Sequence, residues 1–314
     1  MRLFIFLLAL VIISCKSGDV KIDNQNDSEK IESFMEFLSS DDLGGRETGT
    51  TGIEKAAIFI EEQFNHNELK PYFNTFRDSF KIKDIDGFNI VGTLKGNDPG
   101  LSDEYILIGA HYDHIGQRAK PVNLDSIANG ANDNAAGTTA VLMLANYFAK
   151  SKSNKRSLIF ALFSGEEMGL QGSQHLSKRL KDQNLDLYTM INFEMVGVPL
   201  IDRDYLAFIS GYDLSNMAKK INEYARSNLI GKSDVAVKYN LFKRSDNYPF
   251  YLDFLVPSQT ISSCDLTNYD FYHHVDDEVD KMDFDYMANL IEQLFPAIEA
   301  IANSKEKEIQ LYGE

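Results

Sequence analysis

The feature that most constrains the fold is a regular alternation of apolar strands and amphipathic helices, which begins near residue 88. Runs rich in Val, Ile, Leu and Phe predict strands over residues 88–94, 105–110, 158–163, 189–193, 205–210 and 257–262. Apolar residues at helical spacing predict helices over residues 31–38, 53–64, 135–150, 170–180, 214–228 and 284–302. This order predicts an α/β fold, a single three-layer domain in which a mostly parallel central sheet carries helices on both faces.

The length and charge of the chain limit its organisation and its partners. The 314 residues are 44% hydrophobic, which suits one large domain. No linker-like change of composition interrupts residues 30–304, so we expect residues 30–314 to form one catalytic domain. The formal net charge of −16 would repel phosphate backbones, which argues against nucleic acid as a partner.

The N-terminal segment has the pattern of an export signal. Arg2 precedes an apolar run over residues 3–13, which is too short to span a bilayer stably, and "IISC" then ends at Cys15. We interpret residues 1–14 as a lipoprotein signal peptide, Cys15 as the lipidated residue and residues 15–29 as a polar tether. This predicts an exported bacterial lipoprotein, anchored to a membrane in the periplasm or at the cell surface. The alternative is an ordinary signal peptide in which Cys15 is incidental.

Histidines and carboxylates follow the predicted strands, where the site of a parallel sheet lies. "GAHYDHIG" supplies His111 and Asp113, which share a face in extended backbone, whereas His114 is expected to point elsewhere. One ring nitrogen of His111 could bind a metal while Asp113 or a neighbour holds the ring. "NGANDNAAGT" supplies Asp133 among small residues that permit close approach, although a helix N-cap is an alternative role.

Three later motifs add further candidate ligands. "SGEEMG" supplies Glu166 and Glu167, "INFEMVG" supplies Glu194, and "DFYHHVDDEVD" supplies His273 and its neighbour His274. Each motif alone also fits a solvated turn, an edge position or a charged loop. Together, histidine and carboxylate ligands suit zinc, and two metals roughly 3.5–4 Å apart could clamp a water molecule and a substrate oxygen.

Six motifs in this order resemble the co-catalytic zinc aminopeptidase family, which includes leucyl aminopeptidases, glutamate carboxypeptidase II and glutaminyl cyclases. They are "HYDHIG", "GANDNAAGT", "FSGEEMGLQGS", "INFEMVG", "RSDNYPFY" and "YHHVDDEVDKMD". The resemblance covers about residues 35–300 and implies the phosphorylase/hydrolase-like fold of that family, with two co-catalytic zinc ions.

The resemblance also implies a role for each site residue. His111 and Glu194 correspond to the terminal ligands of one zinc, Glu167 and His273 to those of the other, and Asp133 to the bridging ligand before a cis peptide. Asp113 corresponds to the residue that orients the first histidine. Glu166 corresponds to the general base and Tyr272 to the residue that stabilises the oxyanion. His273 is preferred to His274 because it follows Tyr272 and precedes Asp277 by four residues.

Two departures from the family pattern bear on specificity. Glu194 stands where relatives most often have Asp, close to the position of the substrate's free amine. Asn247 stands where many relatives have His, in the segment that lines the substrate pocket and here contains Ser245, Asp246 and Asn247.

The leading hypothesis is a zinc-dependent aminopeptidase that hydrolyses N-terminal residues from peptides with a free N-terminus. The alternatives are a glutaminyl cyclase-like acyltransferase and a catalytically weak peptide-binding homologue. The absence of tryptophan argues against the cyclase, because the cyclases of this family carry tryptophans near the site. A carboxypeptidase for acidic residues would need a more basic pocket than Lys243 and Arg244 provide.

Overall fold

The computed structural model describes residues 24–313. The predicted signal peptide and Cys15 therefore lie outside the described residues. The first helix, α1 (Asn24–Leu38), begins inside the segment predicted to be a tether, so residues 24–29 are helical. Within residues 24–313, no helix is both long and apolar enough to cross a membrane.

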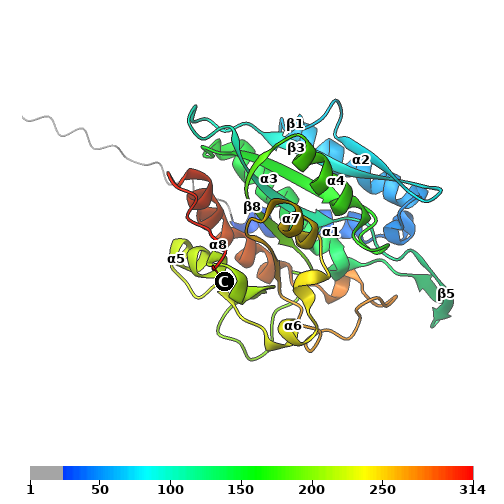
Figure 1. The fold of residues 1–314 in the computed structure, drawn as a ribbon. Coiled ribbons are helices and arrows are strands. Elements are labelled where there is room, and N and C mark those ends of the chain that lie inside the picture. The colour runs from blue at the N-terminus through cyan, green and yellow to red at the C-terminus, as the bar shows by residue number, and fades with distance from the viewer. Residues whose placement is uncertain (1–23, 314) are drawn as a thin grey trace, which may run out of the picture.

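A nine-stranded mixed sheet forms the centre of the molecule, in the order β1-β3-β7-β4-β8-β11-β9-β10, with β2 paired to β3 (Figure 1). The four central strands β7, β4, β8 and β11 are mutually parallel, whereas β3 and β9 run antiparallel to their central neighbours. The strands are β1 (Lys70–Pro71), β2 (Arg77–Ile82), β3 (Ile85–Leu94), β4 (Glu104–His111), β7 (Ser157–Phe163), β8 (Asp186–Phe193), β9 (Ala207–Ile209), β10 (Ile230–Gly231) and β11 (Ser258–Ser262).

Helices cover both faces of this sheet, as the sequence predicts. Helices α1, α2, α3, α5 and α8 lie on one face, and α4 and α7 pack together on the other (Figure 1). The remaining helices of more than one turn are α2 (Thr51–His66), α3 (Gly137–Ser151), α4 (Gln171–Asp182), α5 (Met217–Ala225), α6 (Asp234–Lys238), α7 (Asn247–Phe254) and α8 (Phe284–Asn303).

The central strands are buried on both sides, which explains why they read as continuous apolar runs. Successive residues of a strand point to opposite faces. Ile106 and Ile108 of β4 accordingly join the core under α1, α2, α3 and α8, whereas Leu107 joins the smaller core under α4 and α7. The three layers follow directly from this alternation.

The structure departs from the sequence predictions at several elements. The helix predicted over residues 135–150 begins at Gly137, after a wide helical turn over Ala131–Ala136. The helix predicted over residues 214–228 is shorter at both ends, since α5 spans only Met217–Ala225. The sequence analysis missed β2, α7 and a hairpin of β5 (Gln117–Val122) and β6 (Asp125–Ile127), which projects from the body of the molecule (Figure 1).

Candidate metal centre

Four side chains converge beyond the carboxyl ends of the central strands. One ligand atom from each of His114, Asp133, Glu167 and His273 lies within 4.8 Å of the others. His114 follows β4, Glu167 follows β7, Asp133 precedes α3 and His273 precedes α8. Three of these residues were predicted ligands. The fourth, His114, was expected to point elsewhere, and that expectation was wrong.

The distances within this cluster are those of neighbouring ligands around one ion. His273 Nε2 lies 3.2 Å from Asp133 Oδ2 and 3.1 Å from Glu167 Oε2. His114 Nδ1 lies 2.9 Å from Glu167 Oε1 and 3.7 Å from Asp133 Oδ2. Asp133 and Glu167 therefore each face both imidazoles.

His111 approaches the other oxygen of the same aspartate. Its Nε2 lies 3.3 Å from Asp133 Oδ1, while its Nδ1 lies 3.1 Å from the backbone oxygen of Asp113 and 3.7 Å from the Asp113 carboxylate. The Asp113 carboxylate instead accepts the Thr48 hydroxyl at 3.0 Å and the Glu166 backbone N–H at 3.3 Å. Asp113 thus links the end of β4 to the turn after β7, and its backbone fixes the His111 ring.

That turn separates the two neighbouring glutamates. Gly165 has φ 69°, in the left-handed region that glycine favours, and its N–H donates to Thr48 Oγ1 at 2.9 Å. Glu167 points into the cluster, where burial would raise its pKa but its bonds to His114 and His273 outweigh burial and lower it. Burial raises the pKa of Glu166 well above its usual range, and the neighbouring carboxylate of Glu194 adds to this rise.

The backbone around Asp133 is held in place by the Asp277 carboxylate. The N–H of Asp133 and that of Asn132 donate to the two oxygens of Asp277, at 3.0 and 2.8 Å. The peptide bond between Asp133 and Asn134 is cis, as the family resemblance implies. Asn134 Nδ2 donates to the backbone oxygen of Phe193 at 2.9 Å, which attaches this loop to the end of β8.

The buried Arg46 connects the loop after β4 to the loop that carries Asp133. Its guanidinium donates to the backbone oxygens of Tyr112 and Gly130 at 2.9 Å each, and of Asn129 at 2.6 Å. Burial lowers its pKa to about 10, although the surrounding carboxylates oppose this effect. Arg46 therefore ties the segment carrying His111 and His114 to the segment carrying Asp133.

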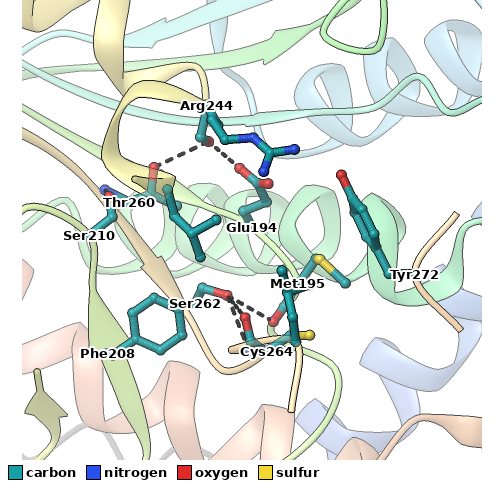
Figure 2. A pocket seen from close by; sticks show the side chains of 12 residues that line it. Glu194, Met195, Phe208, Ser210, Arg244, Thr260, Ser262, Cys264 and Tyr272 are labelled. Atoms are coloured by element: carbon teal, nitrogen blue, oxygen red, sulfur yellow. Dashed lines mark hydrogen bonds between the residues drawn. The ribbon is translucent and has the colours of Figure 1, made fainter. Parts of the chain in front are cut away.

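Glu194 follows β8 and lines a neighbouring cavity. Ser245 donates a hydrogen bond to Glu194 Oε2, and Asn192 Nδ2 donates to Ser245 Oγ at 2.8 Å. Burial raises the pKa of Glu194 to about 7, although the nearby His111 lowers it. Figure 2 shows Glu194, Arg244 and Tyr272 around one side of this cavity.

Tyr272 joins the cavity to the metal cluster. Its ring stacks on that of His273, with centroids 4.0 Å apart and an interplanar angle of 23°. It is 38% exposed and lines the cavity with apolar side chains of Met195, Phe208, Leu241 and Leu266. The cavity is thus a mainly apolar pocket that begins beside Glu194 and Tyr272.

The three predicted pocket residues take different positions. Ser245 lines the cavity, but Asp246 and Asn247 are fully buried behind it. Asn247 Oδ1 accepts the Thr260 hydroxyl at 2.8 Å, and its Nδ2 donates to two backbone oxygens at 3.1 Å. Asn247 therefore supports the wall, and the structure does not place Asp246 or Asn247 in contact with the pocket.

The donor atoms fit divalent metal ions. Within residues 24–313, His111 Nε2 and Asp133 Oδ2 are buried without a hydrogen-bond partner. His111 Nε2 faces a carboxylate oxygen of Asp133, and Asp133 Oδ2 faces the imidazole of His273. Such orphaned buried polar atoms are costly unless a ligand satisfies them. Three imidazoles with several carboxylates suit zinc.

Several supporting residues escaped the sequence analysis. Arg46 and Thr48 lie in the loop "GGRETG", and their roles depend on backbone oxygens and carboxylates that are distant in sequence. His114 could have been found because it belongs to the "HYDH" motif, but extended-strand geometry gave the wrong direction for it. The strand ends at His111, so alternation no longer applies at residue 114.

Known proteins match both the sequence and the fold. Residues 89–297, more than half of the chain, match peptidase family M28. A probable leucine aminopeptidase of Trichophyton verrucosum is 26% identical over 250 residues, which cover 76% of this chain and 63% of that protein. Across eight curated relatives the chain spans between 20% and 63% of the relative's length, and several of these relatives are probable zinc metalloproteases.

Solved structures share the fold at low sequence identity. The LapA aminopeptidase of Legionella pneumophila has a TM-score of 0.68 and 20% identity, over 90% of this chain and 74% of that chain. The glutaminyl cyclase of Fimbriiglobus ruber also has a TM-score of 0.68, with 18% identity, over 87% of this chain and 95% of that chain. The fold is therefore shared by an aminopeptidase and a glutaminyl cyclase, whereas the sequence match assigns the family: the chain belongs to peptidase family M28.

Proposed function

We propose that this protein is a zinc-dependent aminopeptidase that removes apolar N-terminal residues from peptides. The observation that carries this proposal is the position of Asp133, whose two carboxylate oxygens face different imidazoles. His111 Nε2 lies 3.3 Å from Oδ1, and His273 Nε2 lies 3.2 Å from Oδ2. One carboxylate between two sets of nitrogen ligands is the arrangement of a bridging ligand.

The proposal assigns two zinc ions to this centre. His111, Asp133 and Glu194 would hold one ion, and Asp133, Glu167 and His273 the other. Zinc would supply Lewis acidity toward the scissile carbonyl. The excess of buried carboxylates supports this assignment, because burial and, to a smaller extent, repulsion from neighbouring carboxylates raise the pKa of Glu166 and Glu194, and bound cations would offset that repulsion.

Glu166 is the proposed general base. Its elevated pKa suits a group that takes a proton from the attacking water and delivers it to the leaving amine. The Tyr272 hydroxyl is the proposed donor to the oxyanion of the tetrahedral intermediate, since partial burial and the carboxylates around it raise its pKa and keep the phenol protonated. The two glutamates thus divide two tasks: Glu167 binds the cation and Glu166 moves the proton.

The adjacent cavity supports selection of the N-terminal residue. Its apolar walls at Met195, Phe208 and Leu266 suit an aliphatic or aromatic side chain. Glu194 at its entrance offers a carboxylate to a free α-ammonium group. A substrate with a blocked amine would lose this ion pair and leave Glu194 uncompensated.

We further propose that the protein is a lipoprotein anchored through Cys15 and exposed to the periplasm or the cell exterior. The basis is the apolar run followed by "IISC" in the sequence. Globomycin treatment of producing cells, which blocks lipoprotein signal cleavage, should then leave an uncleaved precursor.

The activity is tested with a leucyl anilide and its N-acetylated counterpart, using zinc-loaded protein that begins after Cys15. We expect hydrolysis of the free-amine substrate only, and loss of that hydrolysis in Glu166→Gln. Hydrolysis of neither substrate would contradict the proposal, and cyclisation of N-terminal glutamine would then identify an acyltransferase. Hydrolysis of both would remove the proposed role of Glu194 in amine recognition.

A further inference from the structure

His114 occupies a position that the proposed mechanism does not explain. Its side chain is fully buried, and its Nδ1 points into the cluster of Asp133, Glu167 and His273. A buried histidine next to a metal site can serve as a ligand or as a hydrogen-bond donor to a ligand. Its 2.9 Å contact with Glu167 Oε1 fits a hydrogen-bond donor, and its position beside Asp133 and His273 fits a ligand.

Asp133 Oδ2 is buried without a hydrogen-bond partner in the described part of the chain, although two imidazole nitrogens face it. His114 Nδ1 is 3.7 Å away, which is too far for a hydrogen bond, although the same nitrogen lies within hydrogen-bond distance of Glu167 Oε1, at 2.9 Å. Ligand atoms around a tetrahedral zinc are about 3.3 Å apart, given zinc–ligand distances of about 2.0–2.1 Å. The four separations between nitrogen and oxygen atoms in this cluster, 2.9, 3.1, 3.2 and 3.7 Å, bracket that value.

The surrounding chain holds His114 in place. Gly130 has φ 59°, and a Cβ atom there would lie 2.5 Å from His114 Cγ, so the absence of a side chain makes room for the ring. Arg46 binds the Gly130 carbonyl at 2.9 Å, and the Arg46 carbonyl accepts the His114 N–H at 3.4 Å. The His114 ring also meets the His273 ring edge to face, with centroids 5.6 Å apart. The imidazole of His114 thus packs against Gly130, and its Nδ1 points toward Asp133, Glu167 and His273.

We propose that His114 Nδ1 is a fourth protein ligand of this half of the centre, which is therefore coordinatively closed. Asp133, Glu167 and His273 provide the other three ligands. A site with four protein ligands has the coordination of a structural zinc, whereas a site with three keeps a position for water. The two halves then differ in function: the half at His111 and Glu194 is open to substrate, and the half at His114 holds its ion permanently and fixes Asp133. This inference rests on the proposed zinc centre.

The first test needs only the wild-type protein, loaded with one equivalent of zinc. Because the closed site binds first, X-ray absorption should show two imidazole ligands on that zinc. One imidazole would overturn the proposal, since the ion would then lack His114 or occupy the other half. Failure to bind any zinc would instead contradict the proposed function itself, so the two failures are distinguishable.

The second test uses variants loaded with cobalt(II), whose visible spectrum is intense only for four-coordinate sites. His114→Ala should lose that spectrum for the first equivalent and weaken its binding more than about 100-fold, because loss of a mere hydrogen-bond partner of a ligand costs roughly 10–100-fold. Added imidazole should restore the spectrum by filling the space above Gly130. His274→Ala, which removes the adjacent histidine outside the cluster, is the matched control and should bind as the wild type does.

His114→Gln separates a ligand from a hydrogen-bond donor. The glutamine amide keeps a donor for Glu167 but replaces the imidazole nitrogen. Loss of the four-coordinate spectrum in this variant supports the proposal. Retention of that spectrum in either His114→Gln or His114→Ala would overturn it and reduce His114 to a residue that positions Glu167.

Discussion

The Asp277 carboxylate accepts the backbone N–H of Asp133 at 3.0 Å and so fixes the position of the proposed bridging ligand from the loop before α8. Its other oxygen accepts the N–H of Asn132 at 2.8 Å and the hydroxyl of Tyr269 at 2.5 Å. This relationship gives a physical reason for the four-residue spacing between His273 and Asp277: one loop supplies a ligand and also holds the loop that supplies another.

Replacing Asp277 should therefore weaken metal binding without touching a ligand. In Asp277→Asn, one acceptor becomes an amide donor that faces a backbone N–H. We expect roughly 10–100-fold weaker zinc binding and a free energy of unfolding lower by about 1–3 kcal/mol. Zinc titration and denaturant unfolding measure both, with Asp276→Asn, a change at the neighbouring carboxylate, as the control. Unchanged zinc affinity would show that Asp133 does not depend on this anchor.

The neighbouring glutamates allow a matched comparison of two isosteric variants. Glu166→Gln should keep the zinc content and lower kcat by roughly 10²–10⁴-fold, the usual contribution of a general acid–base group. Glu167→Gln should lose zinc, because an amide is a poorer ligand than a carboxylate. Elemental analysis alongside kinetics separates the two effects. If both variants lost zinc equally, the division of tasks between them would be wrong.

Zinc binding should release protons. The carboxylates that surround His111 and His273 outweigh burial and raise the pKa of both imidazoles, that of His273 to about 10, so His273 is cationic at pH 7 in the metal-free protein and His111 is shifted toward the cation. Metal ligation requires the neutral ring, so we expect about one proton released per imidazole and zinc affinity that falls as pH decreases. Calorimetry in buffers of different ionisation enthalpy counts these protons. Affinity that stays constant from pH 8 to pH 6 would contradict this expectation.

Gly165 should be sensitive to the smallest added side chain. Its φ of 69° strains any other residue, and a Cβ atom would lie 2.7 Å from Ile82 Cδ1. We expect Gly165→Ala to lower the free energy of unfolding by about 1–3 kcal/mol and to displace Glu166. Gly44→Ala is the matched control, because Gly44 has φ 53° but no atom within 4 Å of its would-be Cβ. Equal effects in the two variants would show that the contact with Ile82 is unimportant.

Glu278 gives a pH-dependent prediction away from the ligands. Burial, together with Asp41 and Asp125, raises its pKa to about 7, although Asn129 opposes this by donating to it at 2.9 Å. A carboxyl group with a raised folded pKa contributes stability below its unfolded pKa of about 4.3 and loses it as pH rises toward 7. Glu278→Gln should therefore gain about 1 kcal/mol over the wild type at pH 8, allowing for solvent screening, and show little gain at pH 4.5. A gain of equal size at both values would contradict this.

The sequence was sufficient to predict the central layers but not their edges. Strands β4, β7 and β8 are buried on both faces, so their apolar runs are unambiguous. Strand β2 reads "RDSFKI" and the β5–β6 hairpin is largely exposed, so neither shows the apolar pattern of a core strand. Helix α7 begins in the segment interpreted as a pocket, and its tyrosines and proline give no clear helical period.

The site was predicted where motif order fixed the residue and was missed where tertiary contacts decide. Asp133, Glu167 and His273 meet as expected, because each follows or precedes a predicted element at the same end of the sheet. The direction of His114 depends instead on where β4 ends and on the room above Gly130, and neither is encoded in local spacing. Asn247 was assigned to the pocket by its motif, but its side-chain amide donates hydrogen bonds to the backbone oxygens of Phe242 and Ser258 behind the pocket.

The proposed ligands of the centre come from chain segments between residues 111 and 273, so the whole set comes together only in the folded chain. Bringing such distant segments together is the work of folding, and an unfolded chain would have to lose much configurational freedom to imitate it. Zinc at the proposed centre would therefore depend on the folded chain for its full set of ligands. By mass action it then raises the stability of the native state alone, which makes metal supply a determinant of how long the folded protein survives proteolysis.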